Sequence, residues 1–395
     1  MERYKRQIPD GVQDTLPTEC MHKRALMERI RRVFLMSGCF EVETPTFEYY
    51  DVFASGIGSV RQEKVLKFFD GNGRILVLRP DITMPIARLC ATRLYEGEQL
   101  RLCYAGNAYG AEDASLASQK EFTQMGVELI GVSGAAADAE VICTAIEALD
   151  AAGLRDYTIE LGQVEFFKGL MEEAGVGPKE ADALRFAVDE KNLLGVELCL
   201  KNLNMDEGLA QRIKQMTSLY GGPEVFDLAY RFSENKRCKA AVENLREVYA
   251  ALCDFGLERR VSVDFAMLQS LDYYSGIVFK GISAQLGQPI LSGGRYDRLL
   301  SEFGLSAPAT GFSMGIKRIL IAMERQGALE GEPRVDAVIS ASRQKRGEAY
   351  QKAGEMRRKG VVTELALHLD RAGLEHYAAQ KGAMPVFIEE APCSR

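Results

Sequence analysis

Gln124, Gly126 and Glu128 occupy alternate positions in residues 121–130, a stretch in which polar and apolar side chains alternate. If this stretch is a β-strand, the three residues share one face, and the apolar residues face a core. Gln124 and Glu128 would then stand roughly 13 Å apart, with a glycine between them that leaves room above the strand. Such a polar floor suits a small ligand that carries a cationic group. A strand face exposed to solvent is the alternative interpretation.

Asp81 and Thr83 come shortly after a second predicted strand, residues 74–78. Pro80 breaks that strand, so the two short oxygen-bearing side chains lie at its end. They could hold a polar group of a ligand there. Asp and Thr side chains also stabilise turns and helix ends through local hydrogen bonds, so a turn or a cap is the alternative interpretation.

Tyr273 and Tyr274 are neighbours in a third predicted strand, residues 273–279. Because neighbours in a strand point to opposite faces, this pattern predicts that at most one of the two rings lines a pocket. A tyrosine ring can stack on a planar ligand while its hydroxyl forms a hydrogen bond. A tyrosine packed in the core is the alternative.

Two glycine-rich segments follow in the last third of the chain. Residues 293–297, which include Tyr296, are predicted to form a turn, and residues 311–315 to open a helix over about 313–325. Neither segment has the glycine and lysine spacing of a phosphate-binding loop, and neither has the glycine fingerprint of a dinucleotide site. The glycines alone therefore predict no nucleotide site.

The elements that must position these residues combine strands with long helices. A helix is predicted over residues 18–37, and another is predicted to begin near Asp138 as its N-cap and to end at Gly153. Charged helical patterns dominate residues 165–256, which indicates a helical insertion. Further strands are predicted over residues 40–44, 100–104, 261–265 and 289–291.

These elements predict an α+β fold with two domains. The first is a core over residues 1–325 that contains the insertion. Residues 327–333 are predicted to form a linker. Residues 334–395 alternate strands and helices again, which predicts a small α/β domain at the end of the chain.

The composition limits the classes of function. Hydrophobic residues make up 47% of the 395 residues and charged residues 27%, the balance of a soluble globular protein. No apolar run is long enough to span a bilayer, and the charged N-terminus lacks a signal peptide, so we expect a cytoplasmic protein without membrane contact. The nine cysteines are scattered, which favours free thiols, and the three dispersed histidines predict no metal site. The net charge of −7 argues against a nucleic-acid partner.

Taken together and in order, several segments resemble the histidyl-tRNA synthetase family. The matching segments are residues 9–14, 38–45, 78–83, 121–131, 271–276, 293–297 and 311–318. The resemblance covers roughly residues 8–325 and implies the antiparallel sheet core of a class II aminoacyl-tRNA synthetase. Residues 334–395 are similar to a shortened form of the anticodon-binding domain of that family.

Departures from the family pattern concern the activation of the amino acid by ATP. Gly110 stands where the synthetases have an arginine that grips the α-phosphate of ATP, and Asp113 stands where another basic residue is usual. Gln269 replaces the arginine that precedes the tyrosine pair. In phosphoryl chemistry such cations contribute factors on the order of 10³ or more in rate. The resemblance therefore implies that the chain, although it keeps Arg318, has no catalytic residues and cannot activate an amino acid.

The residues that recognise histidine in the family are better retained. In the synthetases a carboxylate, a threonine and a glutamine hold the α-amino group, and a glutamate and a tyrosine hold the imidazole. The resemblance implies a histidine site composed of Asp81, Thr83, Gln124, Glu128, Tyr273, Tyr274 and Tyr296. Asp81 is shorter than the glutamate of the family, which alters the contact geometry at that position.

A chain that binds histidine without activating it is similar to the regulatory subunits of ATP phosphoribosyltransferase, the first enzyme of histidine biosynthesis. This resemblance implies a hetero-octamer with the short-form catalytic subunit, a homodimer through residues 38–45, L-histidine as the feedback effector, and no cofactor. The alternatives are a functioning histidyl-tRNA synthetase, another synthetase-like histidine-binding protein, and a structural homodimer with an empty pocket.

Overall fold

Strand β6 (Glu121–Ile130) lies inside a nine-stranded sheet and has the bounds that the alternating pattern predicts. β5 (Leu100–Tyr109) and β12 (Ala309–Gly315) pair with it on its two sides, both antiparallel. The apolar side chains of β6 face the main hydrophobic core. The structure is a computed structural model that describes residues 5–54, 65–110, 120–203, 205–269, 273–329 and 331–389.

The strand order of the large sheet is β1-β5-β6-β12-β11-β10-β7-β9-β8. Its other strands are β1 (Phe40–Glu41), β7 (Thr158–Gln163), β8 (Tyr220–Gly221), β9 (Val261–Asp264), β10 (Ile277–Ile282) and β11 (Leu291–Arg295). Neighbours are antiparallel except for β1 with β5 and β7 with β9. A second sheet has the order β2-β4-β3, formed by β2 (Phe47–Tyr49), β3 (Lys67–Phe69) and β4 (Ile75–Leu78).

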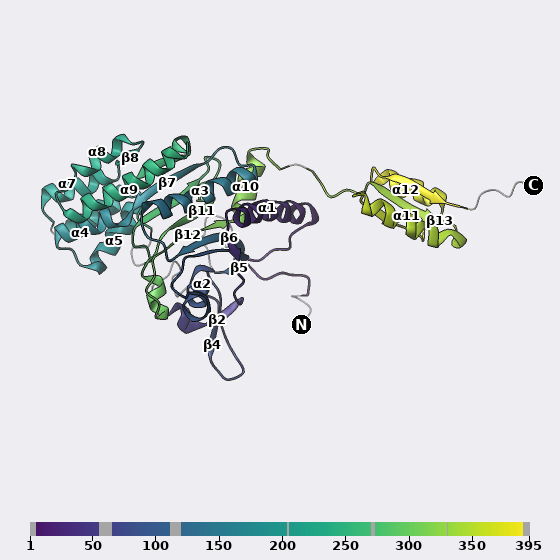
Figure 1. Ribbon diagram of the computed structural model, residues 1–395, viewed down its shortest axis with the longest axis horizontal. Coiled ribbons are helices and arrows are strands. Elements are labelled where there is room, and N and C mark those ends of the chain that lie inside the picture. The colour runs from purple at the N-terminus through teal and green to yellow at the C-terminus, as the bar shows by residue number, and fades with distance from the viewer. Residues whose placement is uncertain are drawn as a thin grey trace, which may run out of the picture. The chain divides into compact units, whose positions relative to one another are not determined.

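Helices α1 (Pro17–Met36), α3 (Ala135–Ala152) and α10 (Ile316–Arg325) pack on the apolar face of the large sheet (Figure 1). Leu26, Ile30 and Phe34 recur at helical spacing in α1, and all three are buried. The left-handed backbone of Gly153, with a φ of +92°, ends α3 as predicted, because glycine adopts this conformation without steric cost. A smaller hydrophobic cluster includes α2 (Thr83–Leu89) and four tyrosines.

The helical insertion forms as predicted. It comprises α4 (Val164–Ala174), α5 (Pro178–Asp189), α6 (Leu193–Asn202), α7 (Glu207–Met216), α8 (Glu224–Tyr230) and α9 (Lys236–Asp254). These helices gather at the β7–β9 end of the sheet (Figure 1). The side chain of Asn235 caps α9 by accepting hydrogen bonds from the amides of Arg237 and Cys238. None of the helices in the described residues is long and apolar enough to cross a membrane.

The chain divides into two compact units, Met1–Thr15 with His22–Leu329 and Leu16–Met21 with Glu330–Arg395. The second unit is a three-layer α/β arrangement with a parallel sheet in the order β14-β13-β15. Its elements are β13 (Ala337–Ala341), α11 (Arg346–Arg358), β14 (Thr363–Leu365), α12 (Arg371–Gln380) and β15 (Met384–Ile388). Together with the first unit, this confirms the predicted α+β fold class with a small α/β unit.

Two glycine-rich predictions were wrong. Residues 291–295 form strand β11 instead of a turn, and β12 continues to Gly315, so that α10 begins at Ile316. The physical reason is close packing across the sheet. A Cβ atom on Gly293 would lie 2.4 Å from the carbonyl oxygen of Gly311, and one on Gly311 would lie 1.9 Å from Oε2 of Glu128. These glycines provide space in the strands instead of bending the chain.

Two helix and strand boundaries were also wrong. Tyr273 and Tyr274 precede β10, which begins at Ile277, so the argument that they face opposite sides does not apply. Helix α3 begins at Ala135 with Gly134 as its N-cap, and Asp138 is a buried residue of its first turn. Asp138 has a tertiary role that outweighs its preference for a cap position.

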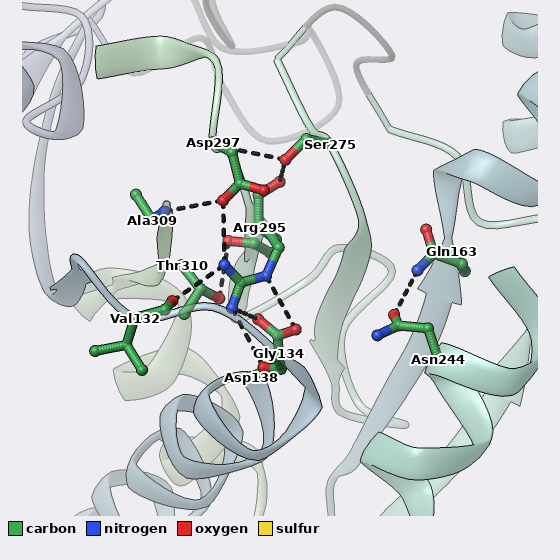
Figure 2. Close-up of polar contacts among 11 residues, drawn as sticks. Val132, Gly134, Asp138, Gln163, Asn244, Ser275, Arg295, Asp297, Ala309 and Thr310 are labelled. Atoms are coloured by element: carbon green, nitrogen blue, oxygen red, sulfur yellow. Dashed lines mark hydrogen bonds and ion pairs between the residues drawn. The ribbon is translucent and has the colours of Figure 1, made fainter. Parts of the chain in front are cut away.

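Asp138 forms a buried ion pair with Arg295 at the end of β11 (Figure 2). Nη2 of Arg295 lies 2.9 Å from Oδ1 of Asp138, and Nε lies 3.1 Å from Oδ2. Nη1 of Arg295 also donates to Oδ1 of Asp297 at 3.1 Å, and that same oxygen accepts a hydrogen bond from the amide of Ala309 at 2.9 Å. The network therefore connects the first turn of α3 with the ends of two sheet strands.

We predict that Asp138→Asn destabilises the folded chain by about 2–3 kcal/mol, because it leaves the buried guanidinium of Arg295 incompletely neutralised. Glu140→Gln is the matched control. It lies in the same helix and also pairs with an arginine, Arg101, but this pair is partly exposed and contributes at most about 1 kcal/mol. Urea unfolding followed by circular dichroism measures both changes. Equal decreases in the free energy of unfolding of the two variants would contradict a special role for Asp138.

Candidate functional site

The centre of the site is the carboxylate of Glu128, which is only 1% exposed in the middle of the large sheet. Oε1 accepts a hydrogen bond from the Thr83 hydroxyl at 2.8 Å, and Oε2 accepts one from the Tyr296 hydroxyl. Gly311, opposite Glu128 in the register of β6 and β12, makes the space that the carboxylate occupies. The interpretation of this strand face as a solvent-exposed surface is therefore wrong.

The electrostatics of Glu128 follow from its burial. Loss of water around the carboxylate raises its pKa from 4.5 to about 8, although the hydrogen bonds from Tyr296 and Thr83 act in the opposite direction. The negative charge of Asp81 raises the pKa further. Among the described residues, no lysine or arginine forms an ion pair with Glu128. A cationic ligand would therefore supply the positive partner charge that these residues do not give this carboxylate.

Three tyrosines pack together beside Glu128. The rings of Tyr273 and Tyr296 stack at 5.5 Å between centroids, and those of Tyr273 and Tyr274 meet edge-on at 4.7 Å. All three are buried, and burial raises the pKa of each phenol. Tyr274 packs over Gly294, where a Cβ would lie 2.8 Å from the tyrosine ring. Both neighbouring tyrosines thus belong to the same hydrophobic cluster.

Asp81 and Thr83 lie where β4 leads into α2. One carboxylate oxygen of Asp81 accepts a hydrogen bond from the amide of Met84 at 2.9 Å, so this residue makes a local contact at the start of α2, whose N-cap is Ile82. Its charge nevertheless acts on Glu128 and on Tyr273, which places it in the electrostatic surroundings of the cluster. Thr83, the first residue of α2, points its hydroxyl at Glu128.

Tyr104 is a member of the cluster that the sequence analysis missed. It lies opposite Gly126 in the register of β5 and β6, and a Cβ on Gly126 would lie 2.5 Å from its hydroxyl oxygen. The predicted room above Gly126 is therefore filled by this ring. The Tyr104 hydroxyl is buried and, within the described residues, has no hydrogen-bond partner. An aromatic residue paired with a glycine across two strands is the signal that could have revealed it.

Gln124 lies apart from this cluster, on the wall of a pocket of about 520 Å³. Its Oε1 atom is buried without a hydrogen-bond partner in the part of the chain that the structure describes. The pocket is also lined by residues 10–13, by Ser313 and by Lys317 and Arg318 in the first turn of α10. The structure thus gathers five of the other six predicted histidine-site residues around Glu128 and places the remaining one, Gln124, on the wall of a separate pocket.

Two of the three positions that depart from the synthetase pattern lie in the described residues, and neither carries a cation. Gly110 is buried at the end of β5 and donates its amide to the carbonyl of Lys120 at 3.0 Å. Gln269 adopts a left-handed backbone with a φ of +44°, and its side-chain amide donates to the carbonyl of Phe279 at 3.5 Å. Asp113, the third departure, lies outside the described residues.

A buried arginine, Arg79, lies close to the site but has a structural role. Its guanidinium donates to the carbonyls of Thr44, at 2.6 Å, and of Asn107, at 2.8 Å. A Cβ on Gly106 would lie 2.5 Å from Nη2 of Arg79, so the glycine makes room for the side chain. Burial lowers the pKa of Arg79. Its donors join β4 to the segments around β1 and β5 instead of facing a ligand.

Comparison with known proteins adds an independent finding. Residues 11–319 match the histidyl-tRNA synthetase family. A protein of Acetivibrio thermocellus named ATP phosphoribosyltransferase regulatory subunit is 46% identical over 97% of this chain and 92% of its own length. A protein of Ruminiclostridium cellulolyticum with the same name is 43% identical over 96% of this chain and 91% of its own.

Solved structures similar to this chain include a protein of the same description and a histidyl-tRNA synthetase. A crystal structure from Bacillus halodurans, described as an ATP phosphoribosyltransferase regulatory subunit/histidyl-tRNA synthetase, superposes with a TM-score of 0.89 and is 32% identical. The match covers 98% of this chain and 99% of that one. The histidyl-tRNA synthetase of Nostoc sp. PCC 7120 has a TM-score of 0.80 at 20% identity over 95% of this chain and 89% of its own, which shows a shared fold.

The raised pKa of Glu128 predicts how stability depends on pH. Because the folded pKa of about 8 exceeds the ordinary value of 4.5, the folded state holds this proton more tightly than the unfolded state between those two values. The contribution is fully present below pH 4.5 and is lost as the pH rises toward 8, at up to about 1.4 kcal/mol per pH unit.

Glu128→Gln removes this titration and keeps an acceptor of nearly the same shape. We expect the ligand-free chain to lose stability relative to Glu128→Gln as the pH rises from 5 to 8. Urea unfolding of both proteins at several pH values measures the difference in their free energies of unfolding. Titrating groups that both proteins share contribute equally and cancel in this difference. A difference in stability that does not change with pH would contradict the buried, protonated carboxyl.

Proposed function

The chain belongs to the family of ATP phosphoribosyltransferase regulatory subunits, which share the histidyl-tRNA synthetase fold, and on this basis we propose that it regulates a separate catalytic subunit. Its partner would be the short-form catalytic subunit of ATP phosphoribosyltransferase, assembled with it in a cytoplasmic hetero-octamer. The chain itself would need no cofactor, nucleic acid or membrane. Its C-terminal α/β unit would be a shortened anticodon-binding-like domain.

The proposed effector is L-histidine, and the observation that carries this proposal is the buried carboxylate of Glu128 without a basic partner. The imidazole would lie between Glu128 and the tyrosines, where a planar ring can stack and a ring N–H can donate to the carboxylate. Asp81, Thr83 and Gln124 would hold the α-amino group. Tyr273, Tyr274 and Tyr296 would form the apolar walls.

Loss of amino-acid activation is part of the same proposal. Gly110 has no side chain, and the amide of Gln269 carries no charge, so neither can stabilise the negative charge that develops when a carboxylate attacks ATP. Arg318 remains at the start of α10, where Nη1 donates to the carbonyl of Pro289 at 2.9 Å. A single arginine does not replace the two that are missing.

We predict that the purified chain binds L-histidine and that Glu128→Ala weakens binding by at least about tenfold, because it removes a charged acceptor from the ligand. Glu121→Ala is the matched control, since it lies on the same strand but is exposed and should leave the affinity unchanged. Isothermal titration calorimetry measures the histidine affinity of the wild-type chain and of both variants. Unchanged affinity in Glu128→Ala would remove Glu128 from the site.

The same sample should show no histidine-dependent exchange between ATP and pyrophosphate. This assay separates the proposed regulatory subunit from its main alternative, a functioning histidyl-tRNA synthetase. Robust exchange would establish the synthetase and overturn the regulatory proposal. Absence of histidine binding would leave a structural subunit with an empty pocket.

A homodimer is expected through the region of β1, where Phe40 is 76% exposed and Met36 is 77% exposed. Large apolar side chains at such exposure favour a protein–protein contact. Sedimentation analysis should show a dimer that Phe40→Asp shifts toward monomer. Phe255→Asp, a change of an exposed phenylalanine in the helical insertion, should not alter the assembly. A monomeric wild-type chain would contradict this interface.

A further inference from the structure

The tyrosines of the proposed histidine pocket are held from outside by the helical insertion. Nζ of Lys168, in α4, donates to the backbone carbonyl of Tyr274 at 3.1 Å and to Oε1 of Glu165 at 3.0 Å. The side chain of Lys168 is only 16% exposed, and burial lowers its pKa. The ion pair with Glu165 joins neighbouring turns of α4 and could form at the helix surface. The burial of Lys168 therefore goes with its contact to Tyr274.

Helix α5 holds the chain just before these tyrosines. Oδ1 of Asp189 accepts hydrogen bonds from the amides of Leu268, at 2.9 Å, and Gln269, at 3.3 Å. A guanidinium nitrogen of Arg185, also in α5, donates to the carbonyl of Gln269. The left-handed backbone of Gln269 is unfavourable for a residue with a side chain, so these contacts stabilise a conformation that the residue does not prefer.

The contacts at Lys168 extend further into the insertion. Glu165, the ion-pair partner of Lys168, also accepts from Nε of Arg237 in α9 at 2.7 Å. Arg237 lies 3.6 Å from the carboxylate of Glu172 in α4. A continuous series of ionic contacts therefore runs from the backbone of Tyr274 to the longest helix of the insertion.

We propose that Lys168 and Arg185 are positioning residues through which the helical insertion holds the tyrosine side of the histidine pocket, so that histidine binding and the order of α4 and α5 are coupled. This inference rests on the proposed function, because it requires that histidine occupies the pocket. Coupling of this kind needs a ligand that interacts differently with two arrangements of the connected elements. The backbone of Tyr274 and Gln269 is where a shift of the tyrosines would reach the insertion.

The decisive variant is Lys168→Met in the full chain, which keeps the length and apolar stem of the side chain but removes the ammonium group. Glu165 remains paired with Arg237, so the insertion should stay folded. We expect histidine affinity to fall by about tenfold. Lys168→Arg keeps a cation and should restore most of the affinity. Lys214→Met is the matched control. It breaks the ion pair with Glu197, which lies in the same insertion and includes none of the proposed pocket residues, and the Lys214 side chain is 36% exposed.

Amide hydrogen exchange separates coupling from a merely structural role. In the wild-type chain, histidine should slow exchange in α4 and α5, and this protection should disappear in Lys168→Met and weaken in Arg185→Met. Arg185→Met tests the second contact independently if Lys168→Met does not fold. Unchanged affinity and unchanged protection in these variants, with histidine still bound by the wild type, would overturn this inference alone. Failure of the wild-type chain to bind histidine would overturn the proposed function and this inference together.

Discussion

Burial of the Glu128 carboxylate without a basic partner is the constraint around which the site is arranged. A charge removed from water is costly unless it is paired or neutralised, and here burial raises the pKa of the group to about 8. Two hydroxyl donors, from Thr83 and Tyr296, are what the described residues supply. The buried tyrosine cluster surrounds them, and the raised pKa favours the protonated form of the carboxyl. The proposed cationic ligand would compensate the charge that deprotonation leaves on this carboxylate.

Much of the fold followed from the sequence. Strand β6 has its predicted bounds, and the insertion and the small α/β unit form as expected, because periodic apolar patterns and helix-ending glycines are local signals. The predictions that were wrong concern residues whose conformation is decided by distant contacts. Gly293 and Gly311 have the composition of a turn, but close packing against neighbouring strands keeps them in the sheet. Asp138 has the preference of an N-cap, but Arg295 is its partner.

The predicted site shows the same limit. Strand alternation alone placed Gln124 and Glu128 on one face, but it could not show that Tyr104 covers Gly126 between them, since the tyrosine comes from the adjacent strand. The predicted histidine-site residues came from the family resemblance, and the comparisons confirm the family. The surroundings of Gln269 could not be predicted, because α5, the helix that holds its backbone, lies some eighty residues earlier in the chain.

The register between β6 and β12 connects Glu128 with the alignment of the sheet, besides its proposed part in histidine binding. Glu128 lies opposite Gly311, whose neighbours in β12 are Thr310 and Phe312. Since side chains alternate along a strand, a slip of β12 by one residue would exchange its two faces and bring a side chain to the place that Gly311 leaves open. The carboxylate would then have no space. A one-residue misalignment of β12 is therefore disfavoured by this carboxylate before any ligand is present.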